Sequence, residues 1–200
     1  MRTHRRVPRA RTVVCAGEVT LIWARGQECG TLEAMRIVVC VKHVPDMQSE
    51  RRFEGGRLVR GEDDVLNELD ENAIEAAVQL KESEEDAGRE AEVVALTMGP
   101  EDAEDSLMRA LQMGADRAYI VSDEFLEGSD VITTASVLSV AIAKIAQECG
   151  PVDLVLTGMA SLDAMTSMLP AALAAKAHMP LLGLARSLSV EGGAVTIERA

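Results

Sequence analysis

Aromatic side chains, basic residues and paired cysteines are scarce in this sequence, and each scarcity excludes a class of function. One Trp, one Tyr and two Phe among 200 residues are too few for a platform that stacks nucleic-acid bases. Lys and Arg number 20 against 33 Asp and Glu, which leaves a net charge of −13 and argues against binding a phosphate backbone. We therefore expect no nucleic-acid partner.

The four cysteines include no CxxC pair and have no histidine at metal-ligand spacing, so we expect neither a metal site nor a disulfide framework. They fit a reducing compartment, and we expect a cytoplasmic location. No stretch approaches the roughly 20 apolar residues that cross a bilayer, so we expect no membrane insertion.

Residues 1–34 differ in charge from the remainder of the chain. They carry six arginines and three glutamates: Arg2, Arg5, Arg6, Arg9, Arg11 and Arg25 against Glu18, Glu28 and Glu33. An Arg-rich start can be a transit peptide. Alternatively, Met35 is the true start, because it opens a strand at once. We adopt the second interpretation, in which residues 1–34 are a non-native or disordered extension and residues 35–200 form the domain.

From Met35 onward, apolar runs of strand length alternate with amphipathic segments of helical length. The expected strands are 36–42, 92–97, 117–121 and 152–157, and the expected helices are 68–83, 101–113, 132–148 and 166–177. A small hairpin is expected around Gly55 and Gly56. This alternation predicts an α/β fold, a doubly wound, mostly parallel sheet with helices on both faces, of the Rossmann-like type that binds adenine nucleotides.

Such sheets bind ligands beyond the carboxyl ends of their strands, where the strand order switches. The segments at these ends are 40–46, 67–70, 97–100 and 158–169. The last is the most suggestive, because Gly158 ends a strand and a helix is expected near Thr166. The free N–H groups of that helix would form a seat for a phosphate. Alternatively, Asp163 or Thr166 only caps the helix.

No catalytic motif accompanies these segments. The chain has no GxSxG, no Walker-type loop, no HExxH and no GxGxxG, and no base, nucleophile or metal cluster stands out. The sequence thus favours a binding protein that performs no catalysis of its own.

Several segments resemble electron-transfer flavoprotein β subunits, the FixA-like family, in order and spacing. They are 35–46 (MRIVVCVKHVPD), 65–82 (VLNELDENAIEAAVQLKE), 92–100 (EVVALTMGP), 111–117 (LQMGADR), 153–158 (DLVLTG) and 190–199 (VEGGAVTIER). The resemblance implies a heterodimer that carries electrons and is not itself an enzyme. In it the α subunit holds most of the FAD site, and the β subunit buries a structural AMP. Electrons would pass from flavin dehydrogenases, such as the acyl-CoA dehydrogenases of fatty acid oxidation, to a quinone oxidoreductase.

The resemblance also assigns the nucleotide-binding residues. They are Cys40 on the first strand, Asn67, Glu68, Leu69 and Asp70 before the first long helix, Met98 before Gly-Pro, and the phosphate-proximal loop Gly158, Met159, Ala160, Ser161, Leu162, Asp163, Ala164, Met165, Thr166, Ser167, Met168 and Leu169. Many members carry glycines after the loop aspartate, where this chain has Ala164 to Met168. Glycine lets a backbone approach a phosphate closely, so this departure reshapes the expected pocket.

A second departure concerns length, because the family continues beyond the position that matches Arg199. We therefore expect a C-terminally truncated domain. Two further hypotheses remain open. In electron-bifurcating relatives the β subunit binds a second FAD in place of AMP. A regulator of the universal-stress type, which binds ATP, would share only the α/β architecture.

Overall fold

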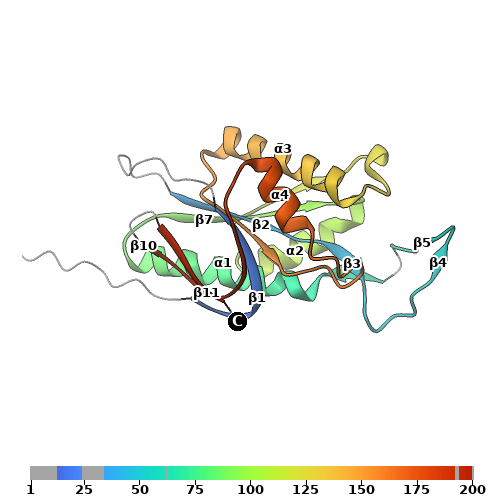
Figure 1. The fold of residues 1–200 in the computed structure, drawn as a ribbon, viewed down its shortest axis with the longest axis horizontal. Helices are drawn as coiled ribbons and strands as arrows, with labels where there is room; N and C mark the ends of the chain where they lie inside the picture. Colours follow the sequence, from blue (N-terminus) through green and yellow to red (C-terminus); the bar gives the residue numbers. More distant parts are fainter. Residues whose placement is uncertain (1–12, 24–33, 62, 192–193, 200) are drawn as a thin grey trace, which may run out of the picture.

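A seven-stranded sheet forms the centre of the computed structural model, which describes residues 13–23, 34–61, 63–191 and 194–199 (Figure 1). The strand order is β11-β10-β1-β9-β2-β7-β8. Strands β9, β2, β7 and β8 run parallel, whereas β1, β10 and β11 pair antiparallel. Their bounds are β1 Val13–Trp23, β2 Met35–Cys40, β7 Ala91–Met98, β8 Arg117–Val121, β9 Leu154–Gly158, β10 Leu181–Glu191 and β11 Ala194–Arg199. The predicted α/β class is confirmed.

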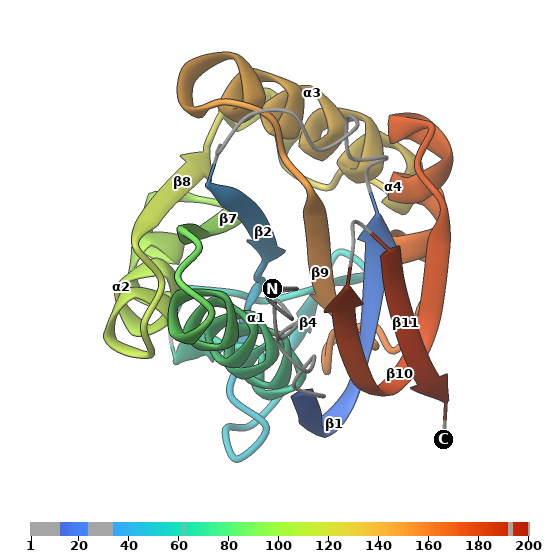
Figure 2. The ribbon, with the colours of Figure 1, turned by 90° about the vertical axis from the view of Figure 1, so that its left-hand side faces the viewer.

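Helices cover both faces of the sheet (Figure 2). The face with α1 (Glu68–Asp86) and α2 (Glu104–Gln112) encloses one apolar cluster, and the face with α3 (Val131–Cys149) and α4 (Leu169–Ala177) encloses the other. Strand residues alternate between the clusters: Val93 and Ala95 point to the first, Val94 and Leu96 to the second. A parallel strand that is buried on both faces needs this continuous apolar sequence.

The topology switches between β2 and β9. From β2 the chain proceeds to β7 and β8 on one side, and then crosses to β9 on the other side of β2. The carboxyl ends of β2 and β9 therefore flank the position where open α/β sheets bind ligands.

Residues 13–23 differ from the expectation that everything before Met35 lies outside the fold. They form β1, which pairs with β9 and β10, and Val19 is fully buried. Its pairing with two distant partners makes this segment a strand. Residues 1–12 and 24–33 lie outside the described residues, so the boundary at Met35 stays a prediction.

The last helix begins later than predicted. It starts at Leu169 with Pro170 in its first turn, and residues 162–164 form a turn ahead of it. The expected helix start at Thr166 is therefore wrong, and so is the capping alternative, since the N-cap is Met168 and no side chain caps the helix. Proline favours this first turn because its fixed φ suits it and its missing N–H is not needed.

Two strand pairs and two short 3-10 helices complete the fold. The predicted hairpin forms from β4 (Phe53–Glu54) and β5 (Arg57–Leu58), and a second pair joins β3 (His43–Pro45) to β6 (Asp64–Leu66). Two short 3-10 helices, Glu101–Ala103 and Glu124–Leu126, precede α2 and α3.

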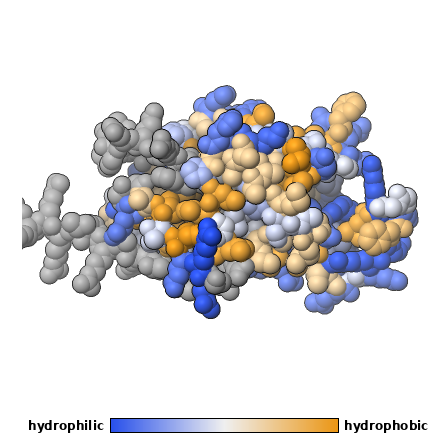
Figure 3. Space-filling view, in the orientation of Figure 1, coloured by the Kyte–Doolittle hydropathy of each residue, from blue (hydrophilic) through white to orange (hydrophobic). Residues whose placement is uncertain are grey.

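Apolar residues at the surface gather over the antiparallel side of the sheet. Figure 3 shows them over β10 and β1, between hydrophilic side chains, and Leu181 and Leu184 of β10 are exposed.

Among the described helices, α3 alone is long and apolar enough to span a bilayer by composition. Its residues Ala135, Leu138, Ile142 and Ile145 are buried in the α3–α4 cluster, so α3 packs against the sheet along this face.

Candidate functional site

Asp70 lies in the first turn of α1 and joins the ends of β2 and β9. Its Oδ2 accepts the backbone N–H of Lys42 at 2.9 Å, and its Oδ1 accepts that of Gly158 at 3.2 Å. Burial raises the pKa of Asp70 to about 7, although the Asn67 amide, the two N–H donors and the Lys42 charge oppose this rise. Both oxygens face the protein interior, so Asp70 holds the strand ends together rather than pointing outward at a ligand.

Gly158 permits this approach. A Cβ at this position would lie 2.5 Å from Asp70 Oδ1 and 2.6 Å from the carbonyl oxygen of Leu69. Both distances are shorter than any tolerable contact, so only glycine allows α1 to begin directly against the end of β9.

Asn67 is fully buried and fixes the loop that follows β9. Its Nδ2 donates to the carbonyl oxygen of Ala160 at 3.0 Å, and its Oδ1 accepts the N–H of Leu162 at 3.0 Å. Its own N–H donates to the Lys42 carbonyl oxygen at 2.9 Å. Asn67 therefore ties the 158–162 segment through its side chain, and the β2 end through its backbone N–H, to the start of α1.

Asp163 is the centre of an ion cluster next to these contacts. Its side chain is only 2% exposed, and Lys42 Nζ lies 2.9 and 2.8 Å from its two oxygens. Arg60 also donates to Asp163, and to the carbonyl oxygen of His43 at 3.3 Å. Burial acts to raise the pKa of Asp163, but the donors Lys42, Arg60 and Ser161 outweigh it and lower the pKa below its ordinary value.

The cations of this cluster are presented to solvent while the carboxylate lies beneath them. The Lys42 and Arg60 side chains are 39% and 37% exposed. Arg51 also reaches the loop and donates to the Leu162 carbonyl oxygen at 3.4 Å. Two cations against one buried carboxylate leave a positive surface in a chain whose net charge is −13. Such a surface attracts anions.

The remainder of the loop, 164–168, is exposed and contains unusual backbone. Met165 and Ser167 have φ of 50° and 51°, the left-handed region that costs L-residues free energy and favours glycine. Met165 and Met168 are 56% and 53% exposed, so they do not fill the core. These residues are not drawn into the contacts around Asn67 and Asp70.

Cys40 and Met98 lie on the opposite face of the sheet, where both pack in the α3–α4 cluster. Burial, with a contribution from the Asp70 charge, raises the pKa of Cys40 to about 12, so the thiol stays neutral. Glu68 is exposed at the start of α1, and Leu69 is half-buried. Whether these residues contact a nucleotide stays a prediction.

Lys42 and Arg60 are not among the predicted nucleotide-binding residues. Lys42 is the last residue of the predicted strand 36–42, and this position at a strand end is a usable signal. Arg60 follows the β4–β5 hairpin and is 103 residues from Asp163, so no local pattern pairs them.

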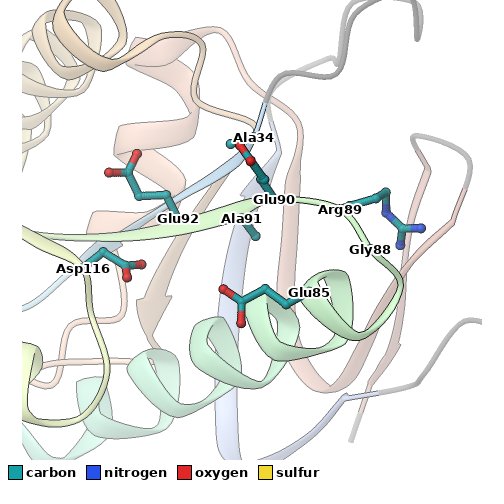
Figure 4. A pocket seen from close by; sticks show the side chains of 8 residues that line it. All are labelled: Ala34, Glu85, Gly88, Arg89, Glu90, Ala91, Glu92 and Asp116. Carbon is teal, nitrogen blue, oxygen red and sulfur yellow. The ribbon is translucent and has the colours of Figure 1, made fainter.

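A separate hollow of about 490 Å³ lies at the amino end of β7 (Figure 4). Two of its carboxylates already have partners: Glu92 binds Arg36 at 2.8 Å and Arg117 at 2.6 Å, and Asp116 binds Lys81 and the Val93 N–H. No group of three or more His, Cys, Asp or Glu residues within the described part of the chain could hold a metal ion. The candidate site is therefore the carboxyl end of β2 and β9.

The chain is similar to known proteins over most of its length. The family model of the electron transfer flavoprotein domain matches residues 56–200. An electron transfer flavoprotein subunit beta of Mycobacterium tuberculosis is 40% identical over 166 residues, and Protein FixA of Azorhizobium caulinodans is 36% identical over 170 residues. A caffeyl-CoA reductase-Etf complex subunit, CarD of Acetobacterium woodii, is 35% identical over 167 residues.

These matches cover 82% of this chain but 61%, 59% and 61% of the three relatives. The chain thus spans about three fifths of the length of the relatives it matches. The part matched by the family model includes α1, β9 and the Asp163 loop.

Proposed function

The chain belongs to the electron transfer flavoprotein family, and from this premise we propose that it is the β subunit of a two-subunit electron carrier. Its task is to hold a nucleotide and to bind the α subunit, which carries the redox-active flavin. The chain supplies binding and orientation, and the flavin supplies the electron chemistry.

The proposed ligand of this chain is a structural AMP, with FAD held mainly by the α subunit. The ion cluster carries this proposal. Lys42 and Arg60 are partly exposed, converge on Asp163 and stand at the carboxyl ends of the strands. A phosphate monoester is an anion with strong acceptor oxygens, which is the chemistry that an exposed Lys–Arg pair recognises.

The proposed partners are flavin dehydrogenases, including acyl-CoA dehydrogenases of fatty acid oxidation, and a quinone oxidoreductase that receives the electrons. The proposed location is the cytoplasm. Family membership supports the electron-carrier role and sets aside the hypothesis of a universal-stress-type regulator.

A second candidate keeps the family and changes the nucleotide to FAD, as in electron-bifurcating carriers. Two observations favour keeping it. The chain is 35% identical to a subunit of a caffeyl-CoA reductase-Etf complex, and its loop has Ala164 to Met168 where we expected glycines.

The test is to co-express the chain with the α subunit of the same source, purify the complex, and identify the released nucleotides by mass. One FAD and one AMP per complex support the first candidate, and two FAD support the second. A complex with a single FAD and nothing else contradicts nucleotide binding by this chain.

A matched pair of variants assigns the site within that complex. Lys42→Ala removes a cation from the cluster, so AMP occupancy should fall at least tenfold. Lys144→Ala removes an exposed lysine of α3 that pairs only with Glu148, so AMP occupancy should stay unchanged. Equal occupancy in the two variants would move the phosphate away from Lys42.

A further inference from the structure

We propose that Asp70 is a positioning residue that sets the nucleotide loop by joining the diverging ends of β2 and β9. This inference rests on the proposed nucleotide-binding function. Asp70 touches no solvent-facing part of the site, and it acts through the backbone of the loop that begins at Gly158.

The place of Asp70 in the sheet carries the argument. The β2–β9 pairing runs from Ile37 and Leu154 to Cys40 and Thr157. Beyond it the strands part, and the N–H groups of Lys42 and Gly158 both turn to the Asp70 carboxylate. An acidic residue in the first turn of a helix ordinarily serves that helix's own N–H groups. Here both oxygens bind the two strands instead.

The first turn of α1 then acts as a template for the loop. Asp70 holds the N–H of Gly158, and Asn67 holds the carbonyl of Ala160 and the N–H of Leu162. Every second residue of the segment 158–162 is thus fixed from one side. This fixing directs Ser161 and Asp163 toward Lys42, whose own N–H is also held by Asp70. One carboxylate therefore places both the cation and the loop that meets it.

The charge of Asp70 is needed for this role. An ionised carboxylate accepts both N–H groups strongly, whereas a protonated carboxyl accepts them more weakly and an amide presents its NH2 donor to one of them. Burial places the pKa of Asp70 at about 7. The ionisable groups that interact with it are the Cys40 thiol and the Lys42 ammonium, and the neutral Asn67 amide also acts on it. The two hydrogen bonds from the Lys42 and Gly158 N–H groups to Asp70 are therefore at full strength above about pH 7 and weaken below it.

The first experiment measures AMP affinity calorimetrically for the full chain and for Asp70→Asn between pH 6 and pH 8. At pH 8 the variant should bind AMP at least tenfold more weakly, and at pH 6 the two affinities should converge to within about threefold. The phosphate of AMP itself ionises near pH 6, but it affects both proteins alike, so the ratio isolates Asp70. A ratio that does not change with pH would overturn the proposal.

The second experiment needs neither a variant nor a ligand. In an NMR titration, the amide proton shifts of Lys42 and Gly158 should move together with one midpoint near pH 7. The Thr133 amide is the control, because it bonds to Asp130 at 2.7 Å and the pKa of Asp130 is lowered, so its shift should stay constant from pH 6 to pH 8. Amide proton shifts of Lys42 and Gly158 that do not change with pH would refute the proposal that ionised Asp70 holds both N–H groups.

The two experiments separate this inference from the proposed function. If the wild-type chain bound neither AMP nor FAD but the two amides titrated together, nucleotide binding would be refuted. The role of Asp70 in holding the ends of β2 and β9 would still be supported. Binding of AMP with flat amide shifts would do the reverse.

Discussion

The two halves of the candidate site are held by different kinds of interaction. The segment 67–70 is tied by hydrogen bonds to backbone groups, and Asn67 and Asp70 are buried. The segment 161–168 is tied mainly through the single carboxylate of Asp163, and its later residues are exposed. Segment 67–70 cannot rearrange without leaving buried polar groups unpaired. Segment 161–168 can exchange its contacts for contacts with water at small cost.

This difference separates positioning from recognition. Buried backbone contacts give a fixed frame, and partly exposed cations on that frame can meet an incoming anion. The two buried carboxylates follow the same division, because the pKa of Asp70 is raised by burial whereas the pKa of Asp163 is lowered by its cationic partners. Substitutions that break one half should therefore leave a signature different from those that break the other.

The largest effect on stability is expected at Gly158, where there is no space for a side chain. Gly158→Ala would put a Cβ 2.5 Å from Asp70 Oδ1, and relieving such overlap costs about 1–3 kcal/mol or more. Urea unfolding should show a loss of about 3 kcal/mol. Gly183→Ala in β10 is the matched control, because nothing lies within 4 Å of its added Cβ. Equal losses in the two variants would contradict the close approach of α1 to β9.

Asn67→Ala should give the next largest effect. It leaves the Ala160 carbonyl and the Leu162 N–H without their partner, and the expected loss of unfolding free energy is about 2 kcal/mol. Asn72→Ala, one turn further along α1 and half-buried, is the control and should change stability little. Denaturant titration of both variants makes the comparison. A small loss at Asn67 would mean that the loop does not depend on it.

The strands and segment 67–70 could be predicted from the sequence better than segment 161–168. Apolar runs of strand length identify β2, β7, β8 and β9, and the ligand rule for parallel sheets then points to their carboxyl ends. Strand β1 was not predicted, because its partners β9 and β10 follow it by more than a hundred residues and no local pattern announces such pairing.

The loop 161–168 shows where sequence reasoning was misled. Thr166 and Ser167 are favoured helix N-caps, yet the helix starts at Leu169 beside Pro170. The proline was the better signal, since it fits the first turn of a helix. The ion cluster around Asp163 could not be predicted at all, because Lys42 and Arg60 are 121 and 103 residues away from it.

The contribution of Asp163 to stability can be distinguished from that of segment 67–70 by its dependence on pH. Because the pKa of Asp163 is lowered in the folded protein, its ionised form contributes stability above the unfolded pKa of about 3.9, and this contribution is lost as the pH falls. Asp163→Asn should therefore cost about 1–2 kcal/mol at pH 7. The gap to wild type should begin to narrow only below the unfolded pKa of about 3.9 and should close as the pH falls through the lower pKa of the folded protein. Urea unfolding at several pH values measures the gap. A gap of the same size at pH 2 and at pH 7 would mean that charge is not what anchors the loop.

The smallest effect is expected in the exposed part of the loop, and its sign is opposite to the others. Ser167 has a φ of 51°, which costs an L-residue about 1–2 kcal/mol, whereas glycine adopts it freely at an entropic cost of about 0.5–1 kcal/mol. Ser167→Gly should therefore stabilise the chain by about 0.5 kcal/mol. Thr166→Gly is the matched control, because Thr166 is not among the residues with positive φ, and it should destabilise by about the entropic cost alone. Thermal unfolding of the two neighbours decides the matter: opposite signs show that the loop keeps its left-handed backbone in solution, and a loss in both shows that its exposed part adopts another conformation.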